Sequence, residues 1–259
     1  MVDEAFAGKE SVALQIEDIQ VHYGLSHVLH GASMDVPEKQ VTVIVGRNGV
    51  GKTTLVNTIM GLVPATQGRV LVGETDLVPL PAHCRRSLGL ALVPQGRRVF
   101  GSLSVSEHLN LLGRAVPGSR FSPERVLELF PRLGDRINAL GRQLSGGEQA
   151  MLSIARALIA NPCIMLMDEP TEGLAPLIVR DVGEMILAMR DAGVTVLLIE
   201  QNLKFALSVA DHVAVMERGC ISHIFMRDEI KDVEALSDLI MQGAGALSET
   251  AGGLNRVQG

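Results

Sequence analysis

Two hydrophobic periods run through the chain, one typical of strands and one typical of helices. Apolar and polar residues alternate over 12–21 and 32–36, which predicts two strands with the turn-rich Tyr23-Gly24 between them. Longer apolar runs without alternation predict strands that are buried on both faces. These runs lie at 41–45, 90–93, 164–167, 194–199 and 213–216, and a further strand is expected at 68–73.

Helices are expected between several of these strands. A helix from about 52 to 60 follows the glycines after the 41–45 run, and an amphipathic helix over 177–189 precedes the 194–199 run. Strands that alternate with helices in this way predict an α/β core around a mostly parallel sheet.

The segment 96–160 has helical spacing instead. Ser104 with Glu107 three residues later predicts a helix N-cap, and Met151, Ile154 and Leu158 recur on one helical face. Because this segment interrupts the alternation of strands and helices, we expect a helical subdomain inserted into the core.

The chain is therefore expected to form one domain with a short tail. The domain is predicted over 12–241, with its core at 12–95 and 161–241 and the helical subdomain at about 96–160. Residues 242–259 are small and polar, which predicts a mobile C-terminal tail.

Composition predicts a folded protein without membrane spans. A hydrophobic content of 47% rules out a disordered chain, yet no apolar run reaches the roughly 18–20 residues that cross a bilayer. The first ten residues lack the basic and apolar blocks of a signal peptide. The three cysteines form no CxxC pair, which argues against disulfides and a zinc ribbon and fits a reducing cytoplasm. A net charge of −6 and 3% aromatic residues argue against a nucleic-acid partner.

The strongest chemical signal follows the apolar run at 41–45. It is the segment Gly46-Arg47-Asn48-Gly49-Val50-Gly51-Lys52-Thr53-Thr54, which matches G-x-x-x-x-G-K-[ST] between a predicted strand and a predicted helix. Glycines allow backbone N–H groups to surround phosphate oxygens, and the helix N-terminus adds partial positive charge. Lys52 can reach the β- and γ-phosphates, and the Thr53 hydroxyl can bind Mg²⁺. We therefore predict a nucleotide site in this loop.

Two carboxylates, Asp168 and Glu169, end the apolar run at 164–167. Taken alone, such a pair is an ordinary strand end that enters solvent. Downstream of a phosphate loop it predicts a hydrolytic site, because parallel sheets bind ligands at the carboxyl ends of their strands. Asp168 can hold Mg²⁺ directly or through water, and Glu169 can polarise a water molecule for attack on the γ-phosphate.

A second glycine motif, Leu144-Ser145-Gly146-Gly147-Glu148-Gln149, precedes the helix that carries Met151 and Ile154. Taken alone, Ser-Gly-Gly predicts a helix cap, which can also serve as an anion site. The phosphate loop, this motif and the strand ending at Asp168-Glu169 resemble, in this order, the ATP-binding subunit of ABC transporters. The resemblance covers nearly the whole chain, from about Leu14 to Met241.

This resemblance implies a fold, two cofactors and a way of pairing. The fold is that of a P-loop NTPase of the ABC ATPase type, with a mostly parallel α/β core, an N-terminal antiparallel β part and an inserted helical subdomain. The cofactors are ATP and Mg²⁺. Two ATP-binding subunits pair head to tail, so that each ATP lies between the 46–54 loop of one subunit and Ser145–Gln149 of the other.

Further site residues are implied by their positions in the family pattern. Tyr23 corresponds to the aromatic residue that stacks on adenine, and Val28 packs on the same base. Gln95 corresponds to the glutamine that contacts Mg²⁺ or water and moves with the transmembrane partner, which the segment 96–100 then faces.

The segments VPQGRRVF, QAML and EGLAP look most like the branched-chain or hydrophobic amino-acid importers. We expect an ATP-hydrolysing subunit on the cytoplasmic face of the inner membrane that energises transmembrane permease subunits. A second ATPase, either related or a second copy, would complete its sites, and a periplasmic-type solute-binding protein would act indirectly.

Two alternatives stay open at this point. One is an importer of urea or short-chain amides, and the other is an ABC-type ATPase without a transport role. The members that act in DNA repair insert long coiled coils between the motifs, and the segment from Gln95 to Leu144 is too short to hold one.

The sequence departs from the family pattern at two places. Gln201 stands where most members have a histidine, and a glutamine can hydrogen-bond the γ-phosphate but cannot carry a positive charge. We expect it to act as a sensor of the γ-phosphate beside the catalytic Glu169 and Lys52. Ala175-Pro176 also replaces the aspartate that usually follows the acidic strand.

Two smaller clusters receive simpler interpretations. His22, His27 and His30 are expected to be exposed histidines of a β-hairpin rather than metal ligands. The basic pair Arg85-Arg86 is expected to lie on a solvated face.

Overall fold

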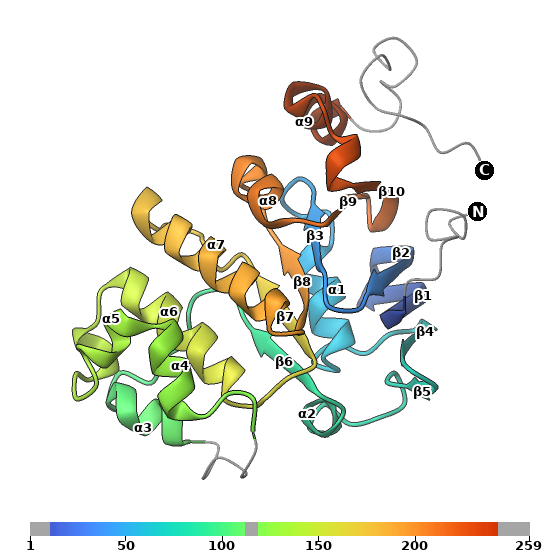
Figure 1. The fold of residues 1–259 in the computed structure, drawn as a ribbon. Coiled ribbons are helices and arrows are strands. Elements are labelled where there is room, and N and C mark those ends of the chain that lie inside the picture. Colours follow the sequence, from blue (N-terminus) through green and yellow to red (C-terminus); the bar gives the residue numbers. More distant parts are fainter. Residues whose placement is uncertain (1–10, 112–118, 243–259) are drawn as a thin grey trace.

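The structure is a computed structural model that describes residues 11–111 and 119–242. It contains one six-stranded and one four-stranded sheet, flanked by helices (Figure 1). The start of the chain and the predicted tail beyond Gln242 lie outside the described residues. Within the described ranges, no helix is both long and apolar enough to span a bilayer.

The six-stranded sheet forms the core and has the strand order β10-β9-β3-β8-β7-β6. Its strands pair in parallel except for β10, which runs antiparallel to β9 at one edge. Their bounds are β3 Val41–Val45, β6 Leu90–Val93, β7 Ile164–Asp168, β8 Thr195–Ile199, β9 His212–Glu217 and β10 Cys220–Met226. All residues of β3, β7 and β8 are buried, as their unbroken apolar runs predicted.

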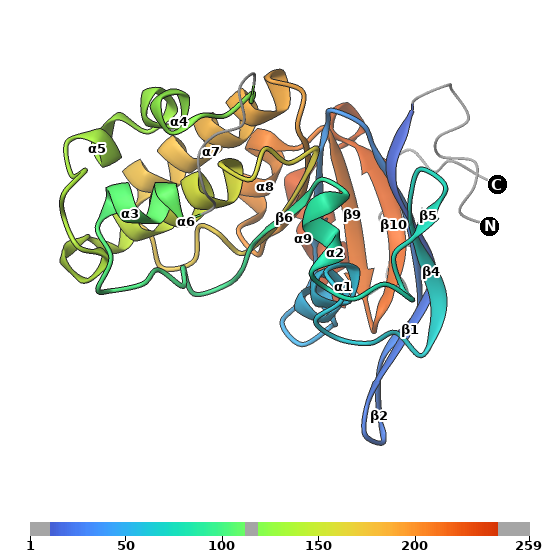
Figure 2. The ribbon, with the colours of Figure 1, turned by 90° about the horizontal axis from the view of Figure 1, so that it is seen from below.

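The four-stranded sheet is antiparallel and has the order β2-β1-β4-β5. Its strands are β1 Val12–Tyr23, β2 Ser26–Pro37, β4 Gln67–Val72 and β5 Thr75–Asp76. β2 begins six residues before the predicted start at 32, because His27 and His30 hide the alternation while Leu29 is buried. The long β1–β2 hairpin extends beyond the rest of the molecule (Figure 2).

Helices cover both faces of the core sheet. One face packs on α1 and the antiparallel sheet, and the other packs on α6, α7, α8 and α9. The helices are α1 Lys52–Ile59, α2 Cys84–Ser87, α3 Val105–Asn110, α4 Pro123–Leu129, α5 Pro131–Gly134, α6 Gly146–Leu158, α7 Pro176–Asp191, α8 Leu203–Val209 and α9 Val233–Gln242, with 3₁₀ turns at Gly141–Gln143 and Arg227–Glu229. Helices α3 to α6 gather to one side of the sheets, so the predicted fold class with its inserted helical subdomain is confirmed (Figure 2).

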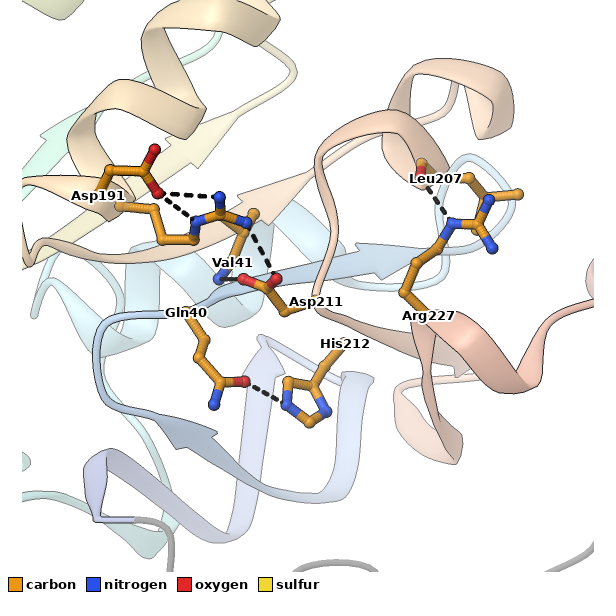
Figure 3. A network of polar contacts seen from close by, with 8 residues as sticks. Gln40, Val41, Asp191, Leu207, Asp211, His212 and Arg227 are labelled. Carbon is orange, nitrogen blue, oxygen red and sulfur yellow. Dashed lines mark hydrogen bonds and ion pairs between the residues drawn. The ribbon is translucent and has the colours of Figure 1, made fainter.

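The amino-terminal edge of the core sheet is held by a polar network (Figure 3). Asp211, just before β9, accepts the backbone N–H of Val41 at 2.8 Å and pairs with Arg190 of α7 at 3.1 Å. Nε2 of the next residue, His212, hydrogen-bonds with Oε1 of Gln40. These contacts fix the start of β3, whose other end leads into the phosphate loop.

The prediction that Arg85 and Arg86 both lie on a solvated face is wrong for Arg85. Arg85 is 1% exposed, and its guanidinium donates to the carbonyl oxygens of Ile59 at 3.1 Å, Leu80 at 2.7 Å and Pro81 at 3.3 Å. It thereby joins the C-terminal end of α1 to the segment before α2, whereas Arg86 is exposed. Carbonyl groups that converge from distant segments cannot be recognised in the sequence.

Candidate nucleotide-binding and hydrolysis site

The site lies at the carboxyl edge of the core sheet. The ends of β3, β8 and β7 are neighbours there, with Ile44 opposite Ile199 and Ile199 opposite Asp168. The loop after β3, the two acids after β7 and the polar residues after β8 therefore meet in one place, although they are far apart in the sequence.

The phosphate loop, 46–54, needs glycine at specific positions. Gly51 has a φ of 111°, and a Cβ atom there would lie 2.7 Å from Cδ2 of Leu29. A Cβ on Gly46 would lie 2.4 Å from the carbonyl oxygen of Met216. The loop is thus a tight cradle, with backbone N–H groups at the start of α1, as an anion-binding loop requires.

Lys52 is held inside this cradle. It is 4% exposed, and its ammonium group donates to the carbonyl oxygens of Gly46 at 2.8 Å and Arg47 at 3.0 Å. Burial lowers the pKa of Lys52, while nearby carboxylates, Glu169 first among them, oppose this shift. The cation therefore lies where a nucleotide's phosphates would need it.

An oxygen pair suited to a divalent cation lies next to the loop. The Thr53 hydroxyl donates to Oδ1 of Asp168 at 3.2 Å. Asp168 is 3% exposed, and burial raises its pKa, while the hydrogen bond from Thr53 opposes the rise. Hydroxyl and carboxylate oxygens are ligands that Mg²⁺ prefers, so these residues fit that ion.

Glu169 is held from two sides by glutamines. Gln95, after β6, donates from Nε2 to Oε2 of Glu169 at 3.3 Å, and Gln201, after β8, donates to the Oε1 atom. The same Gln95 nitrogen lies 3.0 Å from the carboxylate of Glu172. Glu169 has a φ of 48°, uncommon for a residue other than glycine, and backbone strain of this kind is concentrated at functional sites.

Glu200 is a site residue that our sequence analysis missed. It is 2% exposed, and its carboxylate accepts the Thr171 hydroxyl at 2.7 Å and the backbone N–H groups of Thr171 and Gln201. Burial raises the pKa of Glu200, which the hydrogen bonds from Thr171 oppose. It joins the segment after Glu169 to the segment that carries Gln201. An acid at the end of an apolar strand, as at Asp168, was the available signal.

The second glycine motif begins α6. The Ser145 hydroxyl accepts the backbone N–H of Glu148, and the Glu148 carboxylate accepts the backbone N–H of Ser145. Gln149 donates to the carbonyl oxygen of Gly141 at 3.0 Å, and Glu148 pairs with Arg136 at 3.6 Å. The predicted helix cap is present, and these contacts stay within the helical subdomain rather than reaching the phosphate loop.

Tyr23 and Val28 lie on the β1–β2 hairpin. Tyr23 is the last residue of β1, pairs with Ser26 and is 50% exposed. Val28 is half-buried, and its carbonyl oxygen would lie 3.3 Å from a Cβ atom on Gly51. The hairpin thus rests against the phosphate loop while an aromatic ring stays accessible at its end.

A parallel α/β core, a lysine-bearing phosphate loop, adjacent acids at the sheet edge and an inserted helical subdomain define a P-loop ATPase. The chain belongs to the ABC transporter family, because the family model described as "ABC transporter" matches residues 29–172. It is an ATPase of that family.

Several known proteins are similar to the chain. The high-affinity branched-chain amino acid transport ATP-binding protein BraG of Pseudomonas aeruginosa is 40% identical over 210 residues, which is 80% of this chain and 90% of BraG. The probable branched-chain amino acid transport ATP-binding protein LivF of Archaeoglobus fulgidus is 32% identical over 231 residues, 88% of this chain and 98% of LivF. Among solved structures, a nucleotide-free ATP-binding cassette from an ABC transporter superposes with a TM-score of 0.77 at 28% identity, covering 92% of this chain and 98% of that one.

Proposed function

We propose that the chain is the ATP-hydrolysing subunit of an importer for branched-chain or other hydrophobic amino acids. The observation that carries the hydrolytic part is Glu169, held by Gln95 and Gln201 beside the Asp168–Thr53 pair. The names of BraG and LivF support the solute class.

Binding of the nucleotide would use the 46–54 loop and the hairpin. Lys52 and the backbone N–H groups at the start of α1 would hold the phosphates by charge and by hydrogen bonds. Tyr23 would stack on the adenine, with Val28 packing against the same base.

Magnesium would be held by oxygen atoms of Thr53, Asp168 and Gln95. Mg²⁺, when bound, neutralises charge on the phosphates. Asp168 must be ionised to hold the cation. Burial raises its pKa, and the positive charge of a bound cation would oppose that rise. Gln95 has to turn its amide oxygen toward this site, because its nitrogen faces Glu169 and Glu172.

Glu169 would act as the general base. Its carboxylate accepts a proton from the attacking water molecule, which places the developing hydroxide next to the γ-phosphate. Gln201 and Gln95 keep the carboxylate oriented through their N–H donors, so they act as positioning residues toward Glu169. Gln201 would also hydrogen-bond the γ-phosphate as a neutral donor.

The residues Ser145, Gly146, Gly147, Glu148 and Gln149 would complete the site of a second ATP-binding subunit. Within this chain Ser145, Glu148 and Gln149 bond to their own subdomain, and α6 presents its N-terminus. A related ATPase or a second copy would contribute the opposite phosphate loop.

The segment 96–100 would contact a transmembrane permease subunit. Phe100 is 55% exposed, and its ring stacks with His108 and lies 5.5 Å from the Arg156 guanidinium. Phe100 follows Gln95 by five residues, and Gln95 donates to Glu169, so a partner bound to this segment would act on Glu169 through Gln95. The chain would thus sit peripherally on the cytoplasmic face of the inner membrane, with a solute-binding protein acting through the permease.

Reconstitution tests this function. The chain is combined in proteoliposomes with candidate permeases and a candidate solute-binding protein, and ATP hydrolysis is measured with single amino acids, with urea and with short-chain amides. Stimulation by leucine, isoleucine or valine, absent in Glu169→Gln, is the expected result. Stimulation by urea or short-chain amides alone would overturn the solute class, and hydrolysis that persists in Glu169→Gln would overturn the proposed base.

A further inference from the structure

One buried glycine, Gly219, joins the β1–β2 hairpin to the phosphate loop. It lies in the turn between β9 and β10. Its carbonyl oxygen accepts the backbone N–H of His30 in β2 at 3.0 Å, and its own N–H donates to the carbonyl oxygen of Val50 at 2.9 Å. The backbone N–H and carbonyl groups of Gly219 therefore connect Val50 with His30, which are 20 residues apart in the sequence.

Only glycine fits at this position. Gly219 has a φ of 78°, and a Cβ atom would lie 2.2 Å from the carbonyl oxygen of Val28 and 3.1 Å from the backbone nitrogen of His30. These are backbone atoms, so they cannot rotate away as a flexible side chain would. A larger residue at 219 has to push β2 away from the turn.

The phosphate loop packs against the same strand, β2. A Cβ atom on Gly51 would meet the side chain of Leu29 and approach the carbonyl oxygen of Val28. The loop, the turn at 218–219 and the strand segment 28–30 thus form one close junction, in which backbone approaches backbone.

The hairpin is stiffened between this junction and its tip. The rings of His22 and His27 are stacked with centroids 4.0 Å apart at 9°, and the ring of His30 lies 3.9 Å from that of His27. The His27 and His30 rings are tilted at 45°, so ring contacts, one stacked and one tilted, run from the residue bonded to Gly219 to the neighbour of Tyr23. A displacement at His30 would be transmitted to Tyr23.

We infer that Gly219 is a positioning residue that sets the distance between Tyr23 and the phosphate loop. The inference rests on the proposed role of Tyr23 in stacking on adenine. A nucleotide has a fixed span between its base and its phosphates, so both ends bind well only if the two protein segments are held at the matching separation. Gly219 acts through this separation and not by touching the nucleotide.

The test compares Gly219→Ala with Gly73→Ala by calorimetric titration of the purified chain with ATP and with inorganic triphosphate, both with Mg²⁺. Gly73 also has a positive φ, of 57°, but no atom lies within 4 Å of its added Cβ, so it controls for backbone strain. We expect Gly219→Ala to lose about tenfold in ATP affinity, the effect of one base–aromatic stack, with triphosphate affinity unchanged. Unchanged ATP affinity, or equal loss for both ligands, would overturn the inference.

Two further variants separate this inference from the proposed function. Tyr23→Ala should lower ATP affinity, and Gly219→Ala should then add no further loss in that background. If Tyr23→Ala has no effect, the proposed adenine contact fails. If it lowers affinity and Gly219→Ala does not, the positioning role of Gly219 fails. Should Gly219→Ala not fold, His30→Ala, which removes the ring contact between His30 and His27, must weaken ATP but not triphosphate binding for the inference to hold.

Discussion

Gln201 donates a hydrogen bond from its side-chain amide to Oε1 of Glu169, which joins the segments that follow β8 and β7. Glu169 accepts a second bond from Gln95 on its other oxygen. A histidine at position 201 could supply the same donor together with a charge, so the glutamine keeps the contact and gives up the charge.

Replacing Gln201 by alanine is expected to reduce ATP hydrolysis more than ATP binding. The lost hydrogen bond to a charged acceptor corresponds to about a tenfold or greater decrease in kcat. Steady-state hydrolysis and equilibrium nucleotide binding measured on the same sample give the comparison. Gln201→His should recover part of kcat, because imidazole is also a donor. Equal losses in kcat and in affinity would indicate a packing role instead.

Replacing Glu169 by glutamine is expected to preserve binding and stop hydrolysis, with kcat falling about a hundredfold or more. An ATP-bound pair of subunits should then accumulate, which size-exclusion chromatography with Mg²⁺ and ATP can detect, either for this chain alone or with a related ATPase. Glu184→Gln, at an exposed position on α7, is the control. A profile that stays monomeric in both settings would contradict the role of Glu169 as the base.

Replacing Lys52 by alanine is expected to weaken nucleotide binding about a hundredfold or more, because it removes a buried cation from the phosphate loop. Lys204→Ala removes an equal charge from an exposed position and should leave affinity unchanged. Nucleotide titrations of both variants provide the measurement. Binding and turnover that survive in Lys52→Ala would refute the phosphate-loop assignment.

Replacing Asp168 by asparagine is expected to stabilise the nucleotide-free fold near neutral pH. Burial raises the pKa of Asp168 above its ordinary value of 3.8, so the ionised group disfavours folding. The destabilisation by ionised Asp168 is absent below pH 3.8 and complete above the raised pKa. The gain in unfolding free energy of Asp168→Asn should therefore shrink as the pH falls. Urea titrations between about pH 4.5 and 8 test this, with exposed Asp135→Asn as control. A gain independent of pH would argue against burial as its cause.

Replacing Arg85 by methionine is expected to destabilise the fold by about 3 kcal/mol or more. The variant leaves three carbonyl groups without their buried donor, and each unsatisfied group costs about 1–3 kcal/mol. Arg86→Met, next to it and exposed, should change stability by less than about 0.5 kcal/mol. Chemical denaturation measures the free energy of unfolding of both variants. Similar losses for Arg85→Met and Arg86→Met would rule out a structural role for Arg85.

The sequence predicts those features that short segments determine. The buried strands, the phosphate loop and the cap formed by Ser104 and Glu107 each depend on residues that are close in the chain, and each is present. The α/β class follows from the order of such segments.

Features that depend on distant contacts were missed. Strand β10 has polar residues at Ser222 and His223 because it is a half-buried edge strand, so its apolar pattern is weak. Arg85 and Glu200 look like surface charges in the sequence, because only the fold brings together the carbonyl groups that accept from Arg85 and the hydroxyl group that donates to Glu200. Gly219 is one glycine among 27, and only its contacts with Val28 and Val50 distinguish it.

The reciprocal bonds between Ser145 and Glu148 have a consequence for assembly. They hold this end of α6 in place within the chain itself, so a second subunit would meet a preorganised surface and little conformational entropy would be lost there on association. The lifetime of the assembled pair would then depend on the nucleotide between the subunits, and its dissociation rate would report directly on the progress of each turnover.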